Sequence, residues 1–264
     1  MRAVLALVVL SCSGCVATSE PVAPEPIPGL EVEALTPTVW VHTTARDVEG
    51  FGRVLSNGLV VASGSDALLV DTAWGDDPEQ ATASLLAELR LLWGAGVRRA
   101  VVSHHHDDSV GGVPTLRRAG IPIVATSRTA DRMEAEGWPR PDFLLEGGDA
   151  WTLRIGDPGS GPGQVLEVEV FDAGSGHTVD NVVVYVPSAG ILYGGCLIRP
   201  GGSTSLGNTA DADLERWAES VARVRDRYPD LEVVVPSHGP PGGPELLDQT
   251  ISLVESHRGR PVGE

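Results

Sequence analysis

From about Leu30 onward, short apolar runs alternate with stretches in which apolar positions recur every three or four residues. The short runs predict β-strands, and the other stretches predict amphipathic helices. No motif recurs at the spacing of repeat proteins. The predicted strands cover residues 38–43, 53–61, 66–71, 99–102, 122–125, 149–155, 165–171, 181–186, 191–193 and 231–236.

The helical pattern has its clearest ends after the third of these strands. Asp77 can cap a first turn, Pro78 suits the first helical position, and four leucines between residues 85 and 92 form one apolar stripe. Gly94 and Gly96 then end the helix. Further helices are predicted over residues 116–119, 127–137, 213–228 and 245–257.

This order of elements favours a layered fold. The first half is rich in strands and ends in one helix, and the second half has a similar mixture. An α/β (α+β) architecture with two sheets packed together and helices outside accommodates both halves. The chain has 264 residues, which is long enough for one large domain, and we expect that domain to cover residues 30–264.

The first 29 residues have a different composition. Met1 and Arg2 precede an apolar run, residues 3–10, that is too short to cross a bilayer as a helix and is typical of a secretory signal. Ser13-Gly14-Cys15 resembles a bacterial lipoprotein cleavage site, so we predict a signal peptide over residues 1–15 that ends at a lipidated Cys15. An ordinary signal, or cleavage at Cys12, is the alternative. Residues 16–29 are rich in Pro, Glu and Ala and are predicted to be an extended tether.

The formal net charge of −17 restricts the partners. So acidic a chain is not expected to bind nucleic acid, or to bind a membrane surface through a polybasic patch. No later segment is long and apolar enough to be a transmembrane helix. We therefore expect contact with a membrane only through the lipid anchor, with the protein in the periplasm and attached to the outer membrane through Cys15.

The chemically richest stretch is residues 103–112, SHHHDDSVGG, which follows a predicted strand. In an extended loop, His104, His106 and Asp108 would share one side, whereas His105 and Asp107 would face the other. Imidazole and carboxylate donors on one side suit zinc, which binds both at about 2.0–2.2 Å. The alternative is a solvated turn rich in histidine and aspartate.

Three further donors each follow a predicted strand and are flanked by small residues, namely His177, Cys196 and His238. Strand ends gathered at one rim are common positions for functional residues. Cys196 alone would more often be a small buried hydrophobe, but a lone thiol in an oxidising compartment is better protected as a metal-bound thiolate. His42, within a strand, and His257, at a helix end, are predicted to be structural or solvated.

In this order, the donors His104-x-His106-x-Asp108, His177, Cys196 and His238 closely resemble those of the metallo-β-lactamases of subclass B1. The resemblance covers about residues 30–254, and Ser109 stands where glyoxalase II-like and lactonase-like branches carry a histidine. Other similar motifs are Asp71-Thr72-Ala73-Trp74, Gly194-Gly195-Cys196, Leu206-Gly207-Asn208 and Asp211-Ala212-Asp213. One further stretch resembles the New Delhi type in particular, namely Gly50-Phe51-Gly52 followed by Ser56-Asn57-Gly58-Leu59.

The resemblance implies a four-layer αββα sandwich that binds two zinc ions. It assigns the first ion to His104, His106 and His177, and the second to Asp108, Cys196 and His238. It also implies hydrolysis of the β-lactam amide in penicillins, cephalosporins and carbapenems, and hence antibiotic resistance. The rival hypotheses are another zinc hydrolase of the same superfamily and a non-catalytic zinc-binding lipoprotein. We expect a monomer.

Roles in catalysis and substrate binding follow from the same resemblance. Asp108 would orient the water as well as bind metal, and Asn208 would stabilise the oxyanion or, alternatively, act only as a turn residue. Arg199 would meet the substrate carboxylate, where many members have lysine. Phe51, which could instead belong to a plain hairpin turn, and Trp74 would contact the drug.

A second departure from the family pattern is Ser109, which stands where many members have arginine or lysine. We expect this serine to loosen the support around the second zinc.

Overall fold

The computed structural model describes residues 29–94, 96–156, 159 and 165–258. The predicted signal peptide, the lipidation site at Cys15, the alternative site at Cys12 and almost all of the tether lie outside the described residues. Within them, no helix is long and apolar enough to cross a membrane.

The first sheet has seven strands, and its order in space follows the order in the chain. Neighbouring strands are antiparallel from β1 to β4 and parallel from β4 to β7. The strands are β1 (Glu31–Thr36), β2 (Val39–Val48), β3 (Gly52–Ser63), β4 (Asp66–Val70), β5 (Gly96–Val101), β6 (Ile123–Thr126) and β7 (Phe143–Leu145).

The second sheet has five strands in the order β12-β11-β10-β9-β8. Its pairs are antiparallel except for β11 and β12, which run parallel, so their carboxyl ends meet at one edge. The strands are β8 (Ala150–Ile155), β9 (Leu166–Phe171), β10 (Val183–Val186), β11 (Ile191–Gly195) and β12 (Val233–Pro236).

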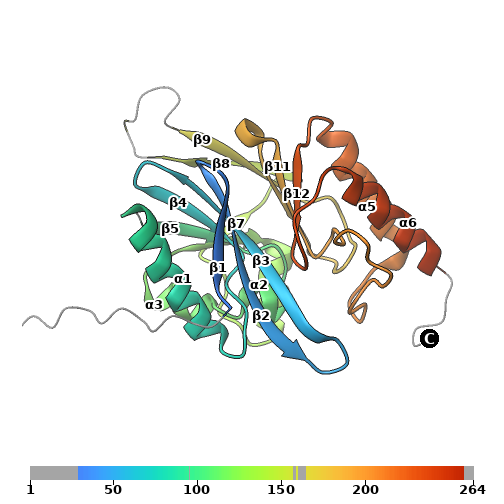
Figure 1. The fold of residues 1–264 in the computed structure, drawn as a ribbon, viewed down its shortest axis with the longest axis horizontal. Helices are drawn as coiled ribbons and strands as arrows, with labels where there is room; N and C mark the ends of the chain where they lie inside the picture. The colour runs from blue at the N-terminus through green and yellow to red at the C-terminus, as the bar shows by residue number, and fades with distance from the viewer. Residues whose placement is uncertain (1–28, 95, 157–158, 160–164, 259–264) are drawn as a thin grey trace, which may run out of the picture.

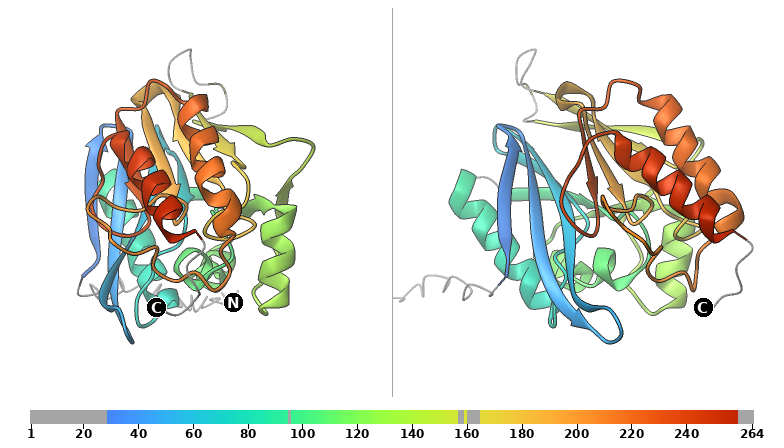
Figure 2. Two further views of the ribbon diagram at one scale, coloured as in Figure 1. Left: turned by 90° about the vertical axis from the view of Figure 1, so that its right-hand side faces the viewer. Right: turned by 45° about the vertical axis from the view of Figure 1, so that its right-hand side comes forward.

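Helices cover the outer face of each sheet (Figures 1 and 2). The first sheet is flanked by α1 (Pro78–Trp93), α3 (Val113–Arg118) and α4 (Ser127–Ala135), and the second by α5 (Leu214–Arg227) and α6 (Glu245–His257). Three apolar cores separate the resulting four layers. One lies under α1 and α3, one between the sheets, and one under α5 and α6. The predicted αββα sandwich is therefore confirmed.

The predicted end signals of α1 are also confirmed. The Asp77 carboxylate accepts a hydrogen bond from the Gln80 backbone N–H at 3.0 Å, and Pro78 is the first helical residue. Gly94 ends the helix in the left-handed conformation, with φ of 61°.

Four short elements were not predicted from the sequence. They are β1, β7, the one-turn helix α2 (Asp107–Val110) and the 3-10 helix η1 (Pro187–Ala189). The two strands lie at opposite edges of the first sheet, and each pairs with one neighbour only. Such edges have exposed positions that blur the apolar pattern; β1, for example, has no fully buried residue.

Candidate metal centre

The donors identified from the sequence come from four connections that meet at one rim of the two sheets. Residues 104–108 follow β5, and His177 lies on the connection from β9 to β10. Cys196 follows β11, and His238 follows β12 by two residues. The backbone N–H of Val182 donates to the Ser103 carbonyl at 2.9 Å, which ties the second of these connections to the first.

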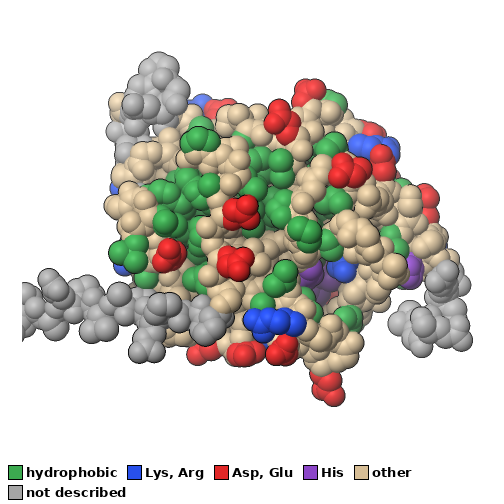
Figure 3. Space-filling model, viewed as in Figure 1, with side chains coloured by type: hydrophobic (Ala, Val, Ile, Leu, Met, Phe, Trp, Pro, Cys, Tyr) green, Lys and Arg blue, Asp and Glu red, His purple; other side chains and the backbone are tan. Residues whose placement is uncertain are grey.

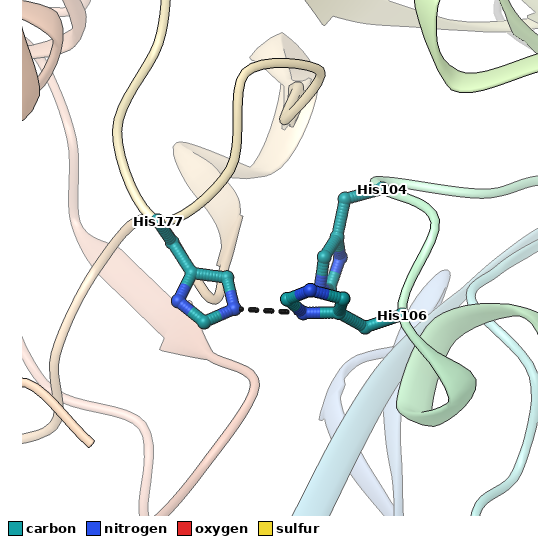
Figure 4. Close-up of side chains that lie close together, drawn as sticks. All are labelled: His104, His106 and His177. Carbon is teal, nitrogen blue, oxygen red and sulfur yellow. Dashed lines mark hydrogen bonds between the residues drawn. The ribbon is translucent and has the colours of Figure 1, made fainter. Parts of the chain in front are cut away.

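The first donor group consists of His104, His106 and His177. One donor atom from each lies within 4.8 Å of the others. His106 Nδ1 and His177 Nε2 are 3.1 Å apart, and Figure 4 shows the three rings turned toward one another. Nitrogen atoms this close, in a largely buried setting, are arranged as if around one small cation.

The second donor group consists of Asp108, Cys196 and His238. Cys196 Sγ is 3.3 Å from Asp108 Oδ2 and 3.4 Å from His238 Nε2, and His238 Nε2 is 3.3 Å from the same carboxylate oxygen. His104 Nε2 lies 3.5 Å from the other oxygen, Asp108 Oδ1, so the two groups adjoin each other through this carboxylate.

The extended-loop argument that joined His104, His106 and Asp108 is wrong in its geometry. The chain turns into α2 directly after His106, and this turn of helix carries Asp108 toward Cys196. The intervening residues His105 and Asp107 are in neither donor group, although Asp107 does line the pocket above them. His105 Nδ1 is 2.8 Å from Asp180, and Asp107 accepts a hydrogen bond from Arg46 at 2.7 Å.

Three of the four imidazoles are oriented through their second ring nitrogen. His104 Nδ1 is 2.9 Å from Ser109 Oγ, His106 Nε2 is 3.1 Å from Asp211 Oδ2, and His238 Nδ1 is 2.7 Å from the Leu55 carbonyl. Outer partners of this kind hold a metal-binding histidine in one tautomer. Ser109 therefore contacts the first donor group, whereas the sequence led us to relate it to the second.

A buried network around Asp71 supports the loop from behind. Asp71 accepts hydrogen bonds of 2.6 Å from both the backbone N–H and the hydroxyl of Ser103, and one of 2.7 Å from the Tyr193 hydroxyl. It is the only non-glycine residue with positive φ, 59°, among those described. Burial raises the pKa of Asp71 to about 6, although the hydrogen bonds from Ser103 and Tyr193 act in the opposite direction.

Burial and mutual charge also set the protonation of the donors. Burial lowers the pKa of His104 to about 4 and lowers that of His177 well below its usual value, so both rings are neutral near pH 7. Burial alone would raise the pKa of Asp108, but in the acid range His104 and His238 are both protonated, and their charges hold that pKa far below its usual value. Burial raises the pKa of the Cys196 thiol, so a thiolate there requires a bound cation.

These donors fit zinc. His104 Nε2 and Asp108 Oδ1 are buried and have no hydrogen-bonding partner among the described residues, which is costly unless something else binds them. Imidazole nitrogen, carboxylate oxygen and thiolate sulfur are the donor types that zinc takes in proteins.

A pocket of about 540 Å³ opens over the donor groups. All four predicted substrate contacts line this pocket, namely Phe51, Trp74, Arg199 and Asn208. Figure 3 shows histidine side chains reaching the surface beside a basic side chain. Phe51, which is 59% exposed on the hairpin between β2 and β3, supplies an apolar wall, whereas Trp74 is almost buried.

The two polar substrate contacts have distinct surroundings. Arg199 is partly buried, its Nε has no hydrogen-bonding partner among the described residues, and its guanidinium lies against Gly207. A Cβ on Gly207 would come within 3.2 Å of Arg199 Nη1, so glycine makes room for the arginine. Asn208 is exposed, and its side-chain oxygen accepts a hydrogen bond of 3.1 Å from Ala210 N. Asn208 therefore makes the local turn contact that the alternative predicts, and it also lines the pocket.

Sequence reasoning missed three charged residues of the pocket: Arg46, Asp107 as its partner, and Glu136. Arg46 also lies over the Trp74 ring, with its guanidinium carbon 4.9 Å from the ring centroid. Arg46 and Glu136 lie on different elements, near the end of β2 and after α4, and no local motif marks either of them.

The two remaining histidines lie away from the pocket, as predicted. His42 is fully buried in β2 against Gly58 of β3, where a Cβ would come within 2.0 Å of His42 Nε2. His257 ends α6, and its Nδ1 is 2.8 Å from the Leu253 carbonyl.

Comparisons with known proteins agree with this architecture. Residues 51–238 match the family model of the Metallo-beta-lactamase superfamily. The metallo-beta-lactamase type 2 of Bacillus cereus is 34% identical over 226 residues, which cover 86% of this chain and 83% of that protein. A solved metallo-beta-lactamase from Pontibacter korlensis is 39% identical with a TM-score of 0.77, covering 86% of this chain and 99% of its own. FIM-1 from Pseudomonas aeruginosa, solved in a mono-zinc form, is 40% identical with a TM-score of 0.77. The match covers 88% of this chain and 97% of FIM-1.

The fold has two stacked sheets between helices, and the site has buried nitrogen, oxygen and sulfur donors at one rim. Together they define a metal-binding αββα protein. With these matches, the chain belongs to the metallo-beta-lactamase superfamily, and its relatives confirm the resemblance to subclass B1. It is thus a hydrolase.

Proposed function

We propose that this protein is a zinc-dependent β-lactamase that opens the β-lactam amide of penicillins, cephalosporins and carbapenems and so confers resistance to them. The observation that carries the proposal is the pair of donor groups beneath a pocket that also contains Arg199. A storage protein needs the donors but not a pocket with a cation and an apolar wall.

Two zinc ions per chain are part of the proposal. His104, His106 and His177 hold the first, and Asp108, Cys196 and His238 hold the second. Bound zinc supplies a Lewis acid that lowers the pKa of water to about 7, which makes hydroxide available at neutral pH. The separations of 3.1–3.4 Å between donor atoms within the groups support these assignments.

The other roles belong to side chains of the pocket. Arg199 lines the pocket and binds the substrate carboxylate through its planar guanidinium. Asn208 donates from its amide nitrogen to the oxyanion, since its side-chain oxygen is already engaged in the turn. Phe51 covers the apolar part of the drug, with Trp74 beneath it.

Asp108 has a double task in this proposal. One of its oxygens, Oδ2, lies with Cys196 and His238, whereas Oδ1 has no hydrogen-bonding partner among the described residues. Oδ1 would accept a hydrogen bond from the attacking water and so orient it toward the substrate. Its far lowered pKa keeps Asp108 ionised for this purpose.

We also infer a location. The signal-like residues 1–15 and the Pro-rich residues 16–29 support export to the periplasm and attachment to the outer membrane through lipidated Cys15. The protein acts there as a monomer on small-molecule drugs.

The function is tested with purified, zinc-loaded protein and one penicillin, one cephalosporin and one carbapenem. We expect turnover of all three that a chelator abolishes and that a serine-directed inhibitor such as clavulanate leaves unchanged. Failure to open a chromogenic cephalosporin, with both donor groups occupied by zinc, would assign the protein to another hydrolase of the superfamily.

A further inference from the structure

A third cluster of donors adjoins the first group at His106, and its other members have no role in the catalytic proposal. One donor atom each of His105, His106 and Asp211 lies within 4.8 Å of the others. Glu136, which follows α4, adds a carboxylate, because its Oε1 is 3.1 Å from His105 Nε2. The cluster therefore joins three elements: the loop after β5, the end of α4 and the loop before α5.

His105 has the hydrogen bonding of a histidine that is set up to bind a cation. Its side chain is 1% exposed, and its Nδ1 lies 2.8 Å from the carboxylate of Asp180, which is itself fully buried. Since a carboxylate accepts hydrogen bonds, Nδ1 donates to Asp180, and the neutral ring then has its lone pair at Nε2. A carboxylate on the far nitrogen is the usual outer partner of a metal-binding histidine.

The lone pair of His105 Nε2 then faces another acceptor. Glu136 Oε1 approaches it to 3.1 Å without hydrogen-bond geometry, and Nε2 is a buried atom that has no hydrogen-bonding partner among the described residues. Two electron-rich atoms held this close repel each other unless a cation lies nearby.

Among the described residues, no arginine supplies this cation. Within the described part of the chain, neither Glu136 nor Asp211 has an arginine within 4.0 Å, and their only ionisable partners are His105 and His106. Asp107, which follows those histidines, differs because Arg46 neutralises it at 2.7 Å. The two carboxylates are 46% and 42% exposed, so an ion can reach them from solvent.

We propose that His105 Nε2, Glu136 and Asp211 form a third binding site, specific for a divalent ion of the zinc class. One imidazole nitrogen with two carboxylates is a zinc-type donor set, whereas Mg²⁺ and Ca²⁺ prefer oxygen alone. Asp211 also holds His106 Nε2 at 3.1 Å, so an ion there would share an outer partner with the first donor group.

The partial exposure of both carboxylates sets the expected strength of the site. It binds more weakly than the two buried groups and fills at higher free zinc. Because the ion joins three elements of the fold, filling the site raises the thermal stability by mass action.

The test combines zinc binding with diffraction, and both are independent of turnover. Equilibrium dialysis at rising free zinc is expected to give one more zinc per chain for wild type than for Glu136→Gln. Glu134→Gln, the same charge change two residues earlier and facing Arg140, is the matched control and keeps the additional ion. His105 itself is left intact, because replacing a buried residue between two donors risks the fold.

Anomalous diffraction at the zinc edge on zinc-soaked crystals locates the ion. We expect a separate peak between His105 Nε2 and the two carboxylates, absent in Glu136→Gln and in Asp211→Asn. The same zinc content in wild type and Glu136→Gln, with no such peak, would overturn the proposal and leave a proton as the cation on His105. The proposed function does not depend on this result, because occupancy of the two buried groups is read from separate peaks in the same map.

Discussion

At the scale of single residues, Cys196 is the donor whose role is easiest to isolate. It is the one free cysteine of the described chain, fully buried between Asp108 and His238. Serine in its place keeps the size but offers a weaker, protonated donor.

We therefore expect Cys196→Ser to bind the second zinc less tightly while the three-histidine group keeps its ion. Turnover falls by about 10–100-fold or more, the order seen when the support of a metal site is weakened. Metal analysis at limiting zinc measures the loss, and an unchanged circular dichroism spectrum shows that the fold survives. Two tightly held zinc ions with undiminished turnover would make Cys196 a mere core residue.

Arg199 carries the prediction for substrate binding. The chain contains no lysine, so every permanently cationic side chain is an arginine, and only Arg199 and Arg46 line the pocket. Arg46 is already paired with Asp107, which leaves Arg199 for the substrate.

Arg199→Ala is expected to raise KM by about 10–100-fold, because hydrogen bonds to a charged group contribute about 1.5–3 kcal/mol. Its kcat changes less, and Arg199→Lys restores part of the affinity. Steady-state kinetics on a cephalosporin measures both constants, with Arg225→Ala, a surface arginine paired with Asp248, as the control. Equal KM values for Arg199→Ala and wild type would remove Arg199 from the binding site.

How far the site could be predicted differs from residue to residue. His177, Cys196 and His238 were found because each follows a strand and has small neighbours, which is a local signal. Arg46, Glu136 and Asp211 reach the same pocket or donor cluster through tertiary packing, and such proximity leaves no mark on the local sequence. The third donor cluster could thus be seen only in the folded molecule.

At the scale of elements, turn and cap chemistry was more informative than strand alternation. Asp77 caps α1 through its side chain, as its position predicts, and the structure shows Asp213 capping α5 in the same way. The turn of helix at residues 107–110 was missed because four residues are too few for a periodic pattern. It nevertheless decides which residues Asp108 meets.

The pairing of β2 with β3 carries a prediction about pH. His42 lies opposite Gly58 in this pair and is completely buried, and burial lowers its pKa to about 4. In the unfolded chain, the His42 side chain has a pKa of about 6.5 and therefore binds a proton more readily. Stability from the neutral ring is therefore complete above about pH 6.5 and is lost as the pH falls toward 4.

For metal-free protein, this linkage costs about 2 kcal/mol of unfolding free energy between pH 7 and pH 5. We expect His42→Gln to lose this part of the pH dependence, whatever its stability at pH 7. Urea unfolding at pH 7 and at pH 5 measures the free energy of unfolding of each variant. The control is His257→Gln, which replaces a partly exposed histidine. A wild-type slope in His42→Gln would show that other groups cause the acid sensitivity.

At the scale of the whole molecule, the layering followed from the order of elements, but the pairing of strands did not. Apolar runs such as residues 66–70 and 231–236 indicate buried strands without saying which sheet contains them. The separation of β1–β7 from β8–β12 depends on contacts between residues far apart in the chain. The family resemblance therefore carried the fold further than the pattern alone.

The attachment of the molecule to a membrane remains a prediction from residues 1–29. We expect Cys15→Ala to release the protein from the membrane fraction or to leave uncut precursor, because lipidation requires that thiol. Fractionation of expressing cells, with Cys12→Ala as the control, distinguishes the two candidate cysteines. Wild-type behaviour of both variants would indicate a soluble periplasmic protein.

The central claim is that zinc in these donor groups opens β-lactams. The most direct measurement is a zinc titration of metal-free protein, followed at once by hydrolysis of a chromogenic cephalosporin and by bound metal. We predict no turnover without metal, and a rise that tracks occupancy of the His104–His106–His177 and Asp108–Cys196–His238 groups. Full turnover in the metal-free protein, or none after both groups are filled, would contradict the account.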